Sequence, residues 1–282
     1  MDRGWAVGIG VALAVGIAGG PHGAASGAPV EAERAQRPAA DGDRRGPAEA
    51  GAWRPGVVAA RQFAKRRAGA VSFAVRTPRS PYRHDAYRLD RSASVVKVML
   101  LAAYLRDPAV RGRSLRADER ALLGAMIRRS DNAAATRVRD VVGNLALERL
   151  AERAGMRRFA TAPSWGATLV TAAGLSKLML RLDRHVPARH RPFALELLAA
   201  VVPRQRWGIA SVPHPGWTLH FKGGWGDYGE RDHQVALLRR GGRRIAVAIL
   251  VTGSPSHAYG KWTLRGVASR LLRGLGPGST PR

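Results

Sequence analysis

The pattern of apolar and polar positions divides the chain into segments of two kinds. Apolar residues at helical spacing predict helices over 56–67, 95–105, 117–127, 133–142, 145–154, 171–182, 192–201 and 259–272. Short runs rich in β-branched and aromatic residues predict strands over 71–76, 87–89, 217–221, 233–239 and 244–251. Gly241 and Gly242 separate the last two strands, and this pair predicts a hairpin turn.

The order of these elements predicts the fold class. Strands come first, a block of helices follows, and further strands with a final helix end the series. This order is typical of an α+β fold in which an antiparallel sheet, built from both ends of the chain, lies beside a reduced helical subdomain. We expect the functional site in a cleft between these two layers.

The two ends of the chain have the composition of segments outside a folded domain. Arg3, an uncharged apolar run and small residues before position 29 predict a signal peptide over 1–28, and hence a secreted or envelope-associated protein. The apolar run is shorter than the roughly 20 residues that a bilayer span needs, which favours a cleaved signal over an anchor. Residues 29–54 predict a flexible linker and residues 274–282 a disordered tail, so the folded domain is expected over 55–273.

Composition narrows the classes of function. The 282 residues include no cysteine, which excludes disulfides, thiolate metal sites and a thiol nucleophile. The formal net charge is +27, but the arginines are scattered and no aromatic residues alternate with them on a strand. We therefore expect no binding to nucleic acid, and expect weak adhesion to anionic cell-wall polymers as the consequence of the charge. No histidine spacing is typical of a metal site.

Ser94 and Lys97 are the first candidates for chemistry. They lie three residues apart at the start of a predicted helix, so the lysine amine and the serine hydroxyl share one face. The positive end of the helix stabilises an alkoxide, and a buried lysine can act as a base. The alternative is a serine that caps an ordinary helix.

Ser130, Asp131 and Asn132 form the second candidate group. A hydroxyl at this place can relay a proton to a leaving group, and an amide can orient both a base and a substrate carbonyl. The chain has only two asparagines, so this tripeptide is a rare coincidence. The alternative is a polar turn that begins the next helix, a role that suits serine and aspartate.

Lys222, Gly223 and Gly224 follow a predicted strand and form the third group. Glycines permit close approach of the backbone to a ligand, and a lysine at a strand edge suits a substrate that carries a carboxylate. The alternative is a strand that runs into a glycine-rich turn.

Together, the three groups resemble the S-x-x-K, S-D-N and K-T-G elements of penicillin-recognising serine enzymes, in the same order along the chain. The chain looks most like class A β-lactamases and their serine hydrolase relatives, over about residues 55–273. The resemblance implies the β-lactamase/transpeptidase-like fold, an acyl-enzyme mechanism, a small-molecule or peptide substrate that bears a carboxylate, no cofactor and no metal, and a monomer.

The resemblance also implies roles for matching residues. Ser94 would be the nucleophile and Lys97 its base, while Ser130 and Lys222 would pass a proton to the leaving nitrogen. Lys222 would also attract an anionic substrate. Substrate binding would fall to Asn132, Gly223, Gly224 and Trp225, with the N–H groups of Ser94 and Trp225 forming an oxyanion hole. Asp131 would brace its own loop.

The chain departs from the family pattern at two places that affect turnover. Class A enzymes use a glutamate to activate the water that releases the acyl group, and the corresponding stretch here, residues 155–177, contains no acidic residue. Gly223 replaces the usual threonine. The sequence therefore predicts a serine hydrolase that is a poor β-lactamase. A D,D-peptidase-like cell-wall enzyme and a non-catalytic wall-binding domain are the alternatives. Asp227, Tyr228 and Glu230 are further candidates for lining the cleft, or else solvated turn residues.

Overall fold

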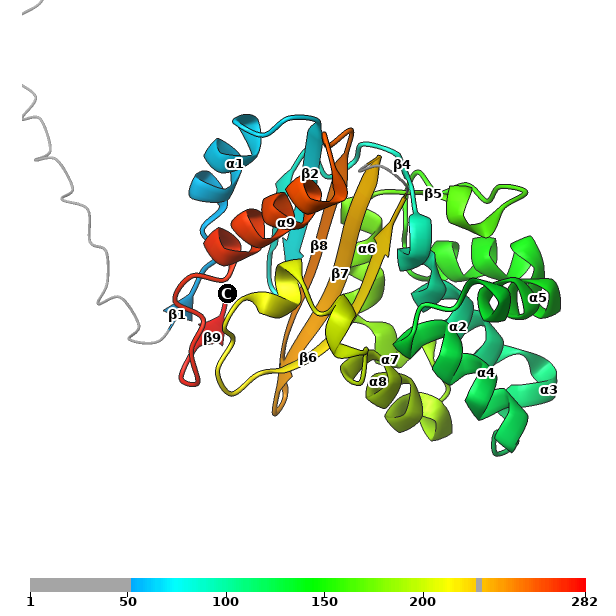
Figure 1. Ribbon diagram of the computed structural model, residues 1–282. Coiled ribbons are helices and arrows are strands. Elements are labelled where there is room, and N and C mark those ends of the chain that lie inside the picture. Colours follow the sequence, from blue (N-terminus) through cyan, green and yellow to red (C-terminus); the bar gives the residue numbers. More distant parts are fainter. Residues whose placement is uncertain (1–51, 227–229) are drawn as a thin grey trace, which may run out of the picture. The chain divides into compact units, whose positions relative to one another are not determined.

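The computed structural model describes residues 52–226 and 230–282. A five-stranded antiparallel sheet runs through this part of the chain, in the order β3-β2-β8-β7-β6 (Figure 1). The sheet is built from both ends of the chain, as predicted. Its strands are β2 (Ala70–Arg76), β3 (Pro81–His84), β6 (Thr218–Trp225), β7 (Arg231–Arg240) and β8 (Arg243–Thr252).

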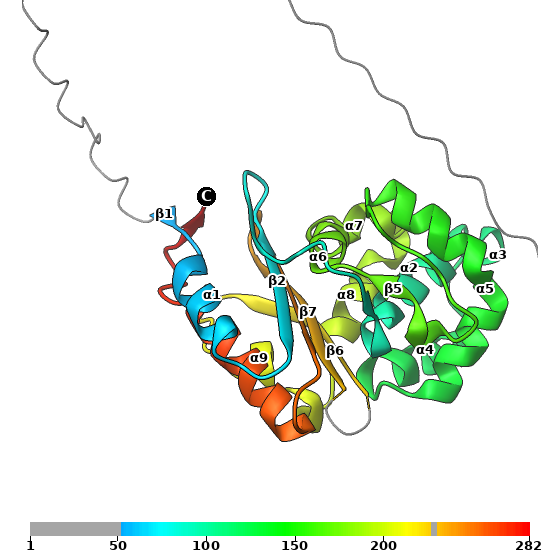
Figure 2. The same ribbon diagram turned by 90° about the horizontal axis from the view of Figure 1, so that it is seen from above.

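Helices cover both faces of this sheet (Figure 2). On one face lie α1 (Val57–Lys65) and α9 (His257–Leu271). The other face carries α6 (Ala172–Leu180), and beyond it lie the remaining helices of the middle of the chain. These are α2 (Lys97–Arg106), α3 (Pro108–Arg111), α4 (Ala117–Arg128), α5 (Asn132–Arg153), α7 (Leu182–His185) and α8 (Arg191–Ala199). The predicted α+β class is confirmed.

The central strands are apolar on both faces because both faces are covered. Val235 and Leu237 of β7 pack into the core on the α6 side, whereas Ala236 and Leu238 pack into the core under α1 and α9. Successive side chains of a strand point to opposite faces, so this alternation divides one strand between two cores. It explains why the sequence shows a continuous apolar run here.

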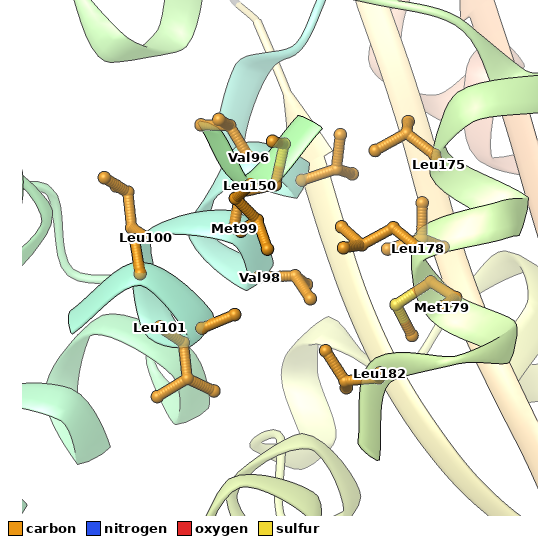
Figure 3. Close-up of a cluster of buried hydrophobic side chains, with 14 of the residues drawn as sticks. Val96, Val98, Met99, Leu100, Leu101, Leu150, Leu175, Leu178, Met179 and Leu182 are labelled. Atoms are coloured by element: carbon orange, nitrogen blue, oxygen red, sulfur yellow. The ribbon is translucent and has the colours of Figure 1, made fainter. Parts of the chain in front are cut away.

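A cluster of aliphatic side chains joins the helical layer to the sheet. Figure 3 shows side chains of α2 facing those of α6 and α7 across a filled interior. Every residue of α2 from Lys97 to Leu105 is buried, so α2 is the central helix of this layer. Lys97 is the one charged residue in that buried run. The sequence therefore places a cation at the buried beginning of the most enclosed helix.

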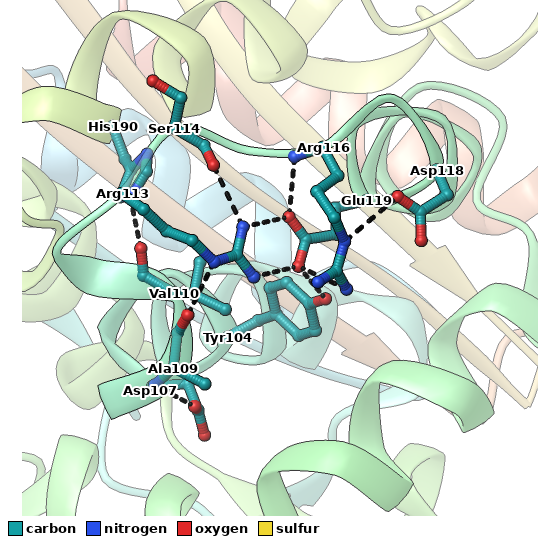
Figure 4. Close-up of polar contacts among 10 residues, drawn as sticks. All are labelled: Tyr104, Asp107, Ala109, Val110, Arg113, Ser114, Arg116, Asp118, Glu119 and His190. Atoms are coloured by element: carbon teal, nitrogen blue, oxygen red, sulfur yellow. Dashed lines mark hydrogen bonds and ion pairs between the residues drawn. The ribbon is translucent and has the colours of Figure 1, made fainter.

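An ion-pair cluster fixes the beginning of α4 against α2 (Figure 4). Glu119 is 2% exposed and accepts hydrogen bonds from Arg113 Nη1 at 2.8 Å and from the backbone N–H of Arg116 at 2.8 Å. Tyr104 of α2 donates its hydroxyl to the same carboxylate at 3.3 Å. The hydrogen bond from Arg113 lowers the pKa of Glu119 to about 2. A buried carboxylate with these partners is stable only in its charged form.

Two predicted helices form one element with a break. The predicted segments 133–142 and 145–154 are joined in α5, where Gly143 has non-helical angles with φ of 67°. Glycine adopts a positive φ at little cost, which is why the helix direction changes at this residue.

The strand predicted over 87–89 is wrong. Residues 85–88 form a turn in which Arg88 N donates to Asp85 O at 3.1 Å, and Asp85 has φ of 43°. The edge strand is β3, and it begins at Pro81, a residue that lacks a backbone donor and is tolerated at the start of an edge strand. Two further residues, Asp90–Arg91, form β4 and pair with β5 (Leu169–Val170).

The segments predicted as linker and tail meet each other where the structure describes them. Strand β1 (Ala52–Trp53) pairs in parallel with β9 (Thr280–Pro281), and Trp53 is buried with its Nε1 donating to Arg273 O at 3.0 Å. Leu275 is also buried, so residues 274–282 are held against the domain. The predicted signal peptide and linker residues 29–51 lie outside the described residues. Within the described residues, no helix has the length and hydropathy of a membrane span.

Candidate active site

Ser94 lies in a short 3-10 helix, Ala93–Val96, that leads directly into α2. Its neighbours Val95 and Val96 are fully buried, which anchors the turn in the core. Ala93 has φ of 45°, a strained value for a residue with a side chain. Ser94 itself is partly buried and lines a cavity.

Lys97 lies one helical turn beyond Ser94, with its side chain fully buried. Its Nζ lies 2.6 Å from the carbonyl oxygen of Ser130 and 2.8 Å from Oδ1 of Asn132. The same Nζ lies 4.6 Å from the centroid of the Trp165 ring. Burial lowers the pKa of Lys97 to about 8, although the Asp131 carboxylate acts in the opposite direction. The lysine can therefore lose its proton near physiological pH.

Ser130 connects α4 to α5 with φ of 60°, an uncommon value for serine. Asp131 then caps α5, because its Oδ1 accepts a hydrogen bond from Ala134 N at 2.7 Å. The cap fixes the turn in a form that directs the carbonyl oxygen and the hydroxyl of Ser130 toward Lys97. Backbone strain of this kind is maintained only where the surroundings hold it.

Lys222 comes from β6 and reaches the same hydroxyl. Its Nζ lies 2.9 Å from Ser130 Oγ and donates to Gly223 O at 2.6 Å, while Lys97 Nζ lies 3.3 Å from Ser130 Oγ. Lys222 is fully buried. Burial, and after it the nearby charge of Lys97, holds the pKa of Lys222 well below its ordinary value. One hydroxyl thus lies between two amines that resist being charged together.

The backbone of β6 approaches the turn that carries Ser94. A methyl group added at Gly224 would lie 2.6 Å from Ser94 N and 2.8 Å from Val95 N, so only glycine fits. The side chain of Trp225 is 38% exposed at the mouth of the site. Gly223 is different, because a methyl group there would make only ordinary contacts with Phe221 and Trp207.

The N–H of Trp225 is directed toward this turn. Gly226 N donates to Arg231 O at 3.0 Å, so the neighbouring pair of Trp225 and Asp232 is a non-hydrogen-bonded pair of the antiparallel ladder. The Trp225 N–H therefore points away from β7, to the free edge of β6, which packs against the turn of Ser94. The Trp225 N–H thus lies on the same side of β6 as the turn of Ser94, as an oxyanion hole formed by residues 94 and 225 would require.

His233 of β7 ties the sheet to the segment before Ser94. Its Nδ1 accepts a hydrogen bond from Val251 N at 3.2 Å, and its Nε2 lies 3.0 Å from Arg91 O. This pattern requires a neutral ring with the proton on Nε2. Burial lowers the pKa of His233 to about 4, which keeps the ring neutral. The histidine thus positions the chain leading to Ser94.

The cavity at the site has a volume of about 270 Å³. Its lining comprises Arg91, Ala93, Ser94, Asn132, Ser164, Trp165, Gly166, Ala167, Trp225 and Arg231. No carboxylate is among these described residues, whereas two arginines are. Within residues 52–226 and 230–282, no cluster of three metal-ligating side chains is present.

Matches to known proteins extend this picture. A model of the β-lactamase enzyme family matches residues 112–275, more than half of the chain. The chain belongs to the β-lactamase enzyme family. The matched region contains Ser130, Asn132 and Lys222, while Ser94 and Lys97 precede it. No curated protein sequence matches the chain.

Solved structures of the same fold support the assignment. A β-lactamase from Sphaerobacter thermophilus has 20% sequence identity and a TM-score of 0.68, and the match covers 78% of this chain and 97% of that one. A class A β-lactamase from Mycobacterium abscessus has 20% identity and a TM-score of 0.65, with 77% and 98% covered. PBP-A has 16% identity and a TM-score of 0.65, with 77% and 94% covered. At these identities the likeness shows the fold.

In this member of the β-lactamase family, the structure brings the sequence-predicted residues to one place. Lys97, Ser130, Asn132 and Lys222 share hydrogen bonds. Ser94, Asn132 and Trp225 line the same cavity, and Gly224 packs on the backbone of Ser94. Gly223 contributes its backbone, since its missing side chain would face Trp207.

Sequence reasoning missed several residues of the site. Trp165 lies over Lys97 within the stretch expected to supply a glutamate, and its Nε1 donates to Thr136 Oγ1 at 3.2 Å. The one clue in the sequence was that Trp165 falls within that loop. Nothing in the sequence distinguishes Arg91 and Arg231 as site residues, because arginine is common throughout the chain. Asp227 and Tyr228 lie outside the described residues, and Glu230 pairs with Arg231 at 2.7 Å.

Proposed function

We propose that the chain is an exported serine hydrolase that forms an acyl-enzyme on Ser94 with a β-lactam or a related amide or ester. The observation that supports this most strongly is the hydroxyl of Ser130 lying between the amines of Lys97 and Lys222. Such an arrangement serves proton transfer better than stability, because burying two amines side by side is costly.

The proposed reaction begins with neutral Lys97, which accepts the proton of the Ser94 hydroxyl as Oγ bonds to the acyl carbon. The negative charge that develops on the substrate oxygen is stabilised by the N–H groups of residues 94 and 225, each worth about 3 kcal/mol in such sites. When the carbon–nitrogen bond breaks, Ser130 gives its proton to the leaving nitrogen. The lysine pair then returns a proton to Ser130.

The substrate is proposed to carry a carboxylate. Arg91 lines the cavity and supplies positive charge at its wall, and Arg231 does so in part, because Glu230 pairs with it at 2.7 Å. Lys222 is a weaker electrostatic partner than the sequence suggests, since burial and the nearby charge of Lys97 lower its pKa. Asn132 is proposed to hold the substrate amide; in support, Lys97 fixes its Oδ1 and the residue lines the cavity.

Release of the acyl group is proposed to be slow. The described lining of the cavity has no carboxylate to activate water. The Trp165 ring lies beside Lys97, where a carboxylate could activate water for release of the acyl group. The chain is therefore proposed to be a poor β-lactamase that accumulates its acyl-enzyme.

The same observations favour a second candidate, a D,D-peptidase-like cell-wall enzyme. PBP-A is among the similar structures, and a mutant of PBP-A was solved as its acyl-enzyme with penicillin G. Release of terminal D-alanine from a model peptide would select this candidate.

Intact-mass measurement after exposure to penicillin G tests the proposal. We expect a covalent adduct on the natural chain that persists over time and is absent in Ser94→Ala. Ser164→Ala is the matched control, because Ser164 lines the same cavity and should leave the adduct unchanged. No adduct with penicillin or any other acylating probe would contradict the proposal and favour a non-catalytic wall-binding domain.

A further inference from the structure

We propose that a basic groove away from the candidate active site binds a linear phosphodiester polyanion without bases, such as a polyol-phosphate chain. The groove consists of two adjoining cavities of about 250 Å³ and about 370 Å³. Arg153, the last residue of α5, lines both. This inference does not depend on the proposed acyl transfer.

The first cavity gathers cations from three elements. Arg76 ends β2, Arg153 ends α5, and Lys177 and Arg181 come from α6 and the residue after it. Glu152 is the one carboxylate in the described lining. None of these four cations forms an ion pair with a described residue, and Arg76 Nε is buried without a hydrogen-bond partner there.

The second cavity lies between α2, α3 and α5, and it is also lined by several cations. Arg106, Arg111 and Arg149 line it together with Arg153. Asp107 is its carboxylate in the described lining, and Asp107 Oδ1 is already engaged as the cap of α3, accepting from Ala109 N at 2.9 Å. The groove therefore carries a large excess of unpaired positive charge.

The crowding of these cations is costly without an anion. Burial lowers the pKa of Lys177, and the neighbouring charges of Arg76 and Arg181 lower it further. The pKa of Arg153 is lowered by burial and then by Arg106 and Arg149, which links the two cavities electrostatically. Successive phosphates lying between these side chains would remove the repulsion and release counterions.

The residues that line the two cavities favour some classes of anionic partner over others. No aromatic residue lines either cavity among the described residues, so the groove offers no surface on which bases could stack. All seven cations line one or both of the two hollows, which share Arg153; three of them are partly buried and four are exposed. A flexible chain can enter such hollows, whereas a flat lipid surface reaches only the exposed side chains. A flexible chain with regularly spaced phosphates can follow both hollows, and the net charge of +27 would speed its encounter.

The groove and the candidate active site lie at opposite ends of the sheet. Arg76 pairs with Ala246 at one end of β2, whereas Ala70, at the other end, pairs with Thr252, the partner of Arg231 in the catalytic cavity. A bound polymer would therefore leave the cleft open.

Isothermal titration with synthetic poly(glycerol phosphate) at several salt concentrations tests the proposal. The double variant Arg153→Gln/Lys177→Gln should bind at least about tenfold more weakly, and the slope of log K against log salt should fall by about 2. The matched control Arg204→Gln/Arg265→Gln removes the same charge from exposed positions outside the groove and should change affinity less than about twofold.

Three results would overturn the inference. Equal weakening in both double variants would show that only net charge matters. Binding of glycerol phosphate monomer as tight as binding of the polymer would exclude an extended site. Tighter binding of single-stranded DNA or of anionic vesicles, with the same loss in the groove variant, would assign another ligand. An unchanged melting temperature in the groove variant confirms that it is folded.

Discussion

In the proposed reaction, the protonation of Lys97 decides whether Ser94 can be activated. Four contacts hold the Lys97 amine in place, and burial lowers its pKa to about 8. The motif alone could predict a shared face for residues 94 and 97, because helical spacing is local. It could not predict the burial, which depends on Ser130 and Trp165 from distant segments.

The pH dependence of acylation follows from this pKa. Below pH 8 the amine is mostly protonated and cannot accept a proton, so the rate constant should rise about tenfold per unit from pH 6 to 7. It should level off above pH 8. Stopped-flow measurement of penicillin acylation checks this, and a rate independent of pH between 6 and 8 would exclude Lys97 as the base.

Gly224 and Gly223 offer a matched pair of substitutions. Gly224→Ala would place a methyl group 2.6 Å from Ser94 N, so the turn of the nucleophile must move and acylation should fall at least about a hundredfold. Gly223→Ala meets only ordinary contacts, the nearest at 3.6 Å, and should acylate within about threefold of the natural chain. Equal rates in the two variants would show that the close approach of β6 is unimportant.

Among the elements, the loop between α5 and α6 is the one that would control release of the proposed acyl group. The sequence could show that this loop lacks an acidic residue. It could not show that Trp165 lies against Lys97, because the position of a loop side chain depends on packing rather than on periodicity.

Trp165→Glu should therefore give the site the group it lacks. A carboxylate beside Lys97 can accept a proton from water, so acyl-enzyme release should accelerate at least about tenfold. Trp165→Gln has a similar size without the charge and should not accelerate release. Mass spectra taken over time measure both variants, and equal release rates would show that a carboxylate at this position is not sufficient.

The contact between α2 and α4 depends on the negative charge of Glu119. Because its pKa is lowered to about 2, its stabilising effect is present above about pH 4.5 and is lost as the pH falls toward 2. Glu119→Gln should lower the free energy of unfolding by about 2 kcal/mol at pH 7, with the difference from the natural chain disappearing near pH 2.

Urea unfolding at several pH values measures this difference. Asp118→Asn is the control, since the Asp118 side chain is 74% exposed and its loss should have little effect. A loss in Glu119→Gln that did not depend on pH would contradict an electrostatic origin.

For the whole molecule, the fold class could be predicted from the order of helices and strands. Each type of element is recognisable in the sequence because helices and strands differ in the spacing of their apolar residues. The pairing of β1 with β9 could not be predicted, since neither end has an apolar periodicity and the anchors, Trp53 and Leu275, are isolated apolar residues. The site likewise depends on long-range contact. Lys97 and Lys222 lie on α2 and β6, far apart in sequence, and meet at one hydroxyl.

A double-mutant cycle on the rate constant of Ser94 acylation shows whether Lys97 and Lys222 act as one proton-transfer unit. Lys97→Ala and Lys222→Ala should each lower the rate constant about a thousandfold, and the double variant should be at most about tenfold slower than either. Losses that instead multiply to about a millionfold would show that the two lysines act independently.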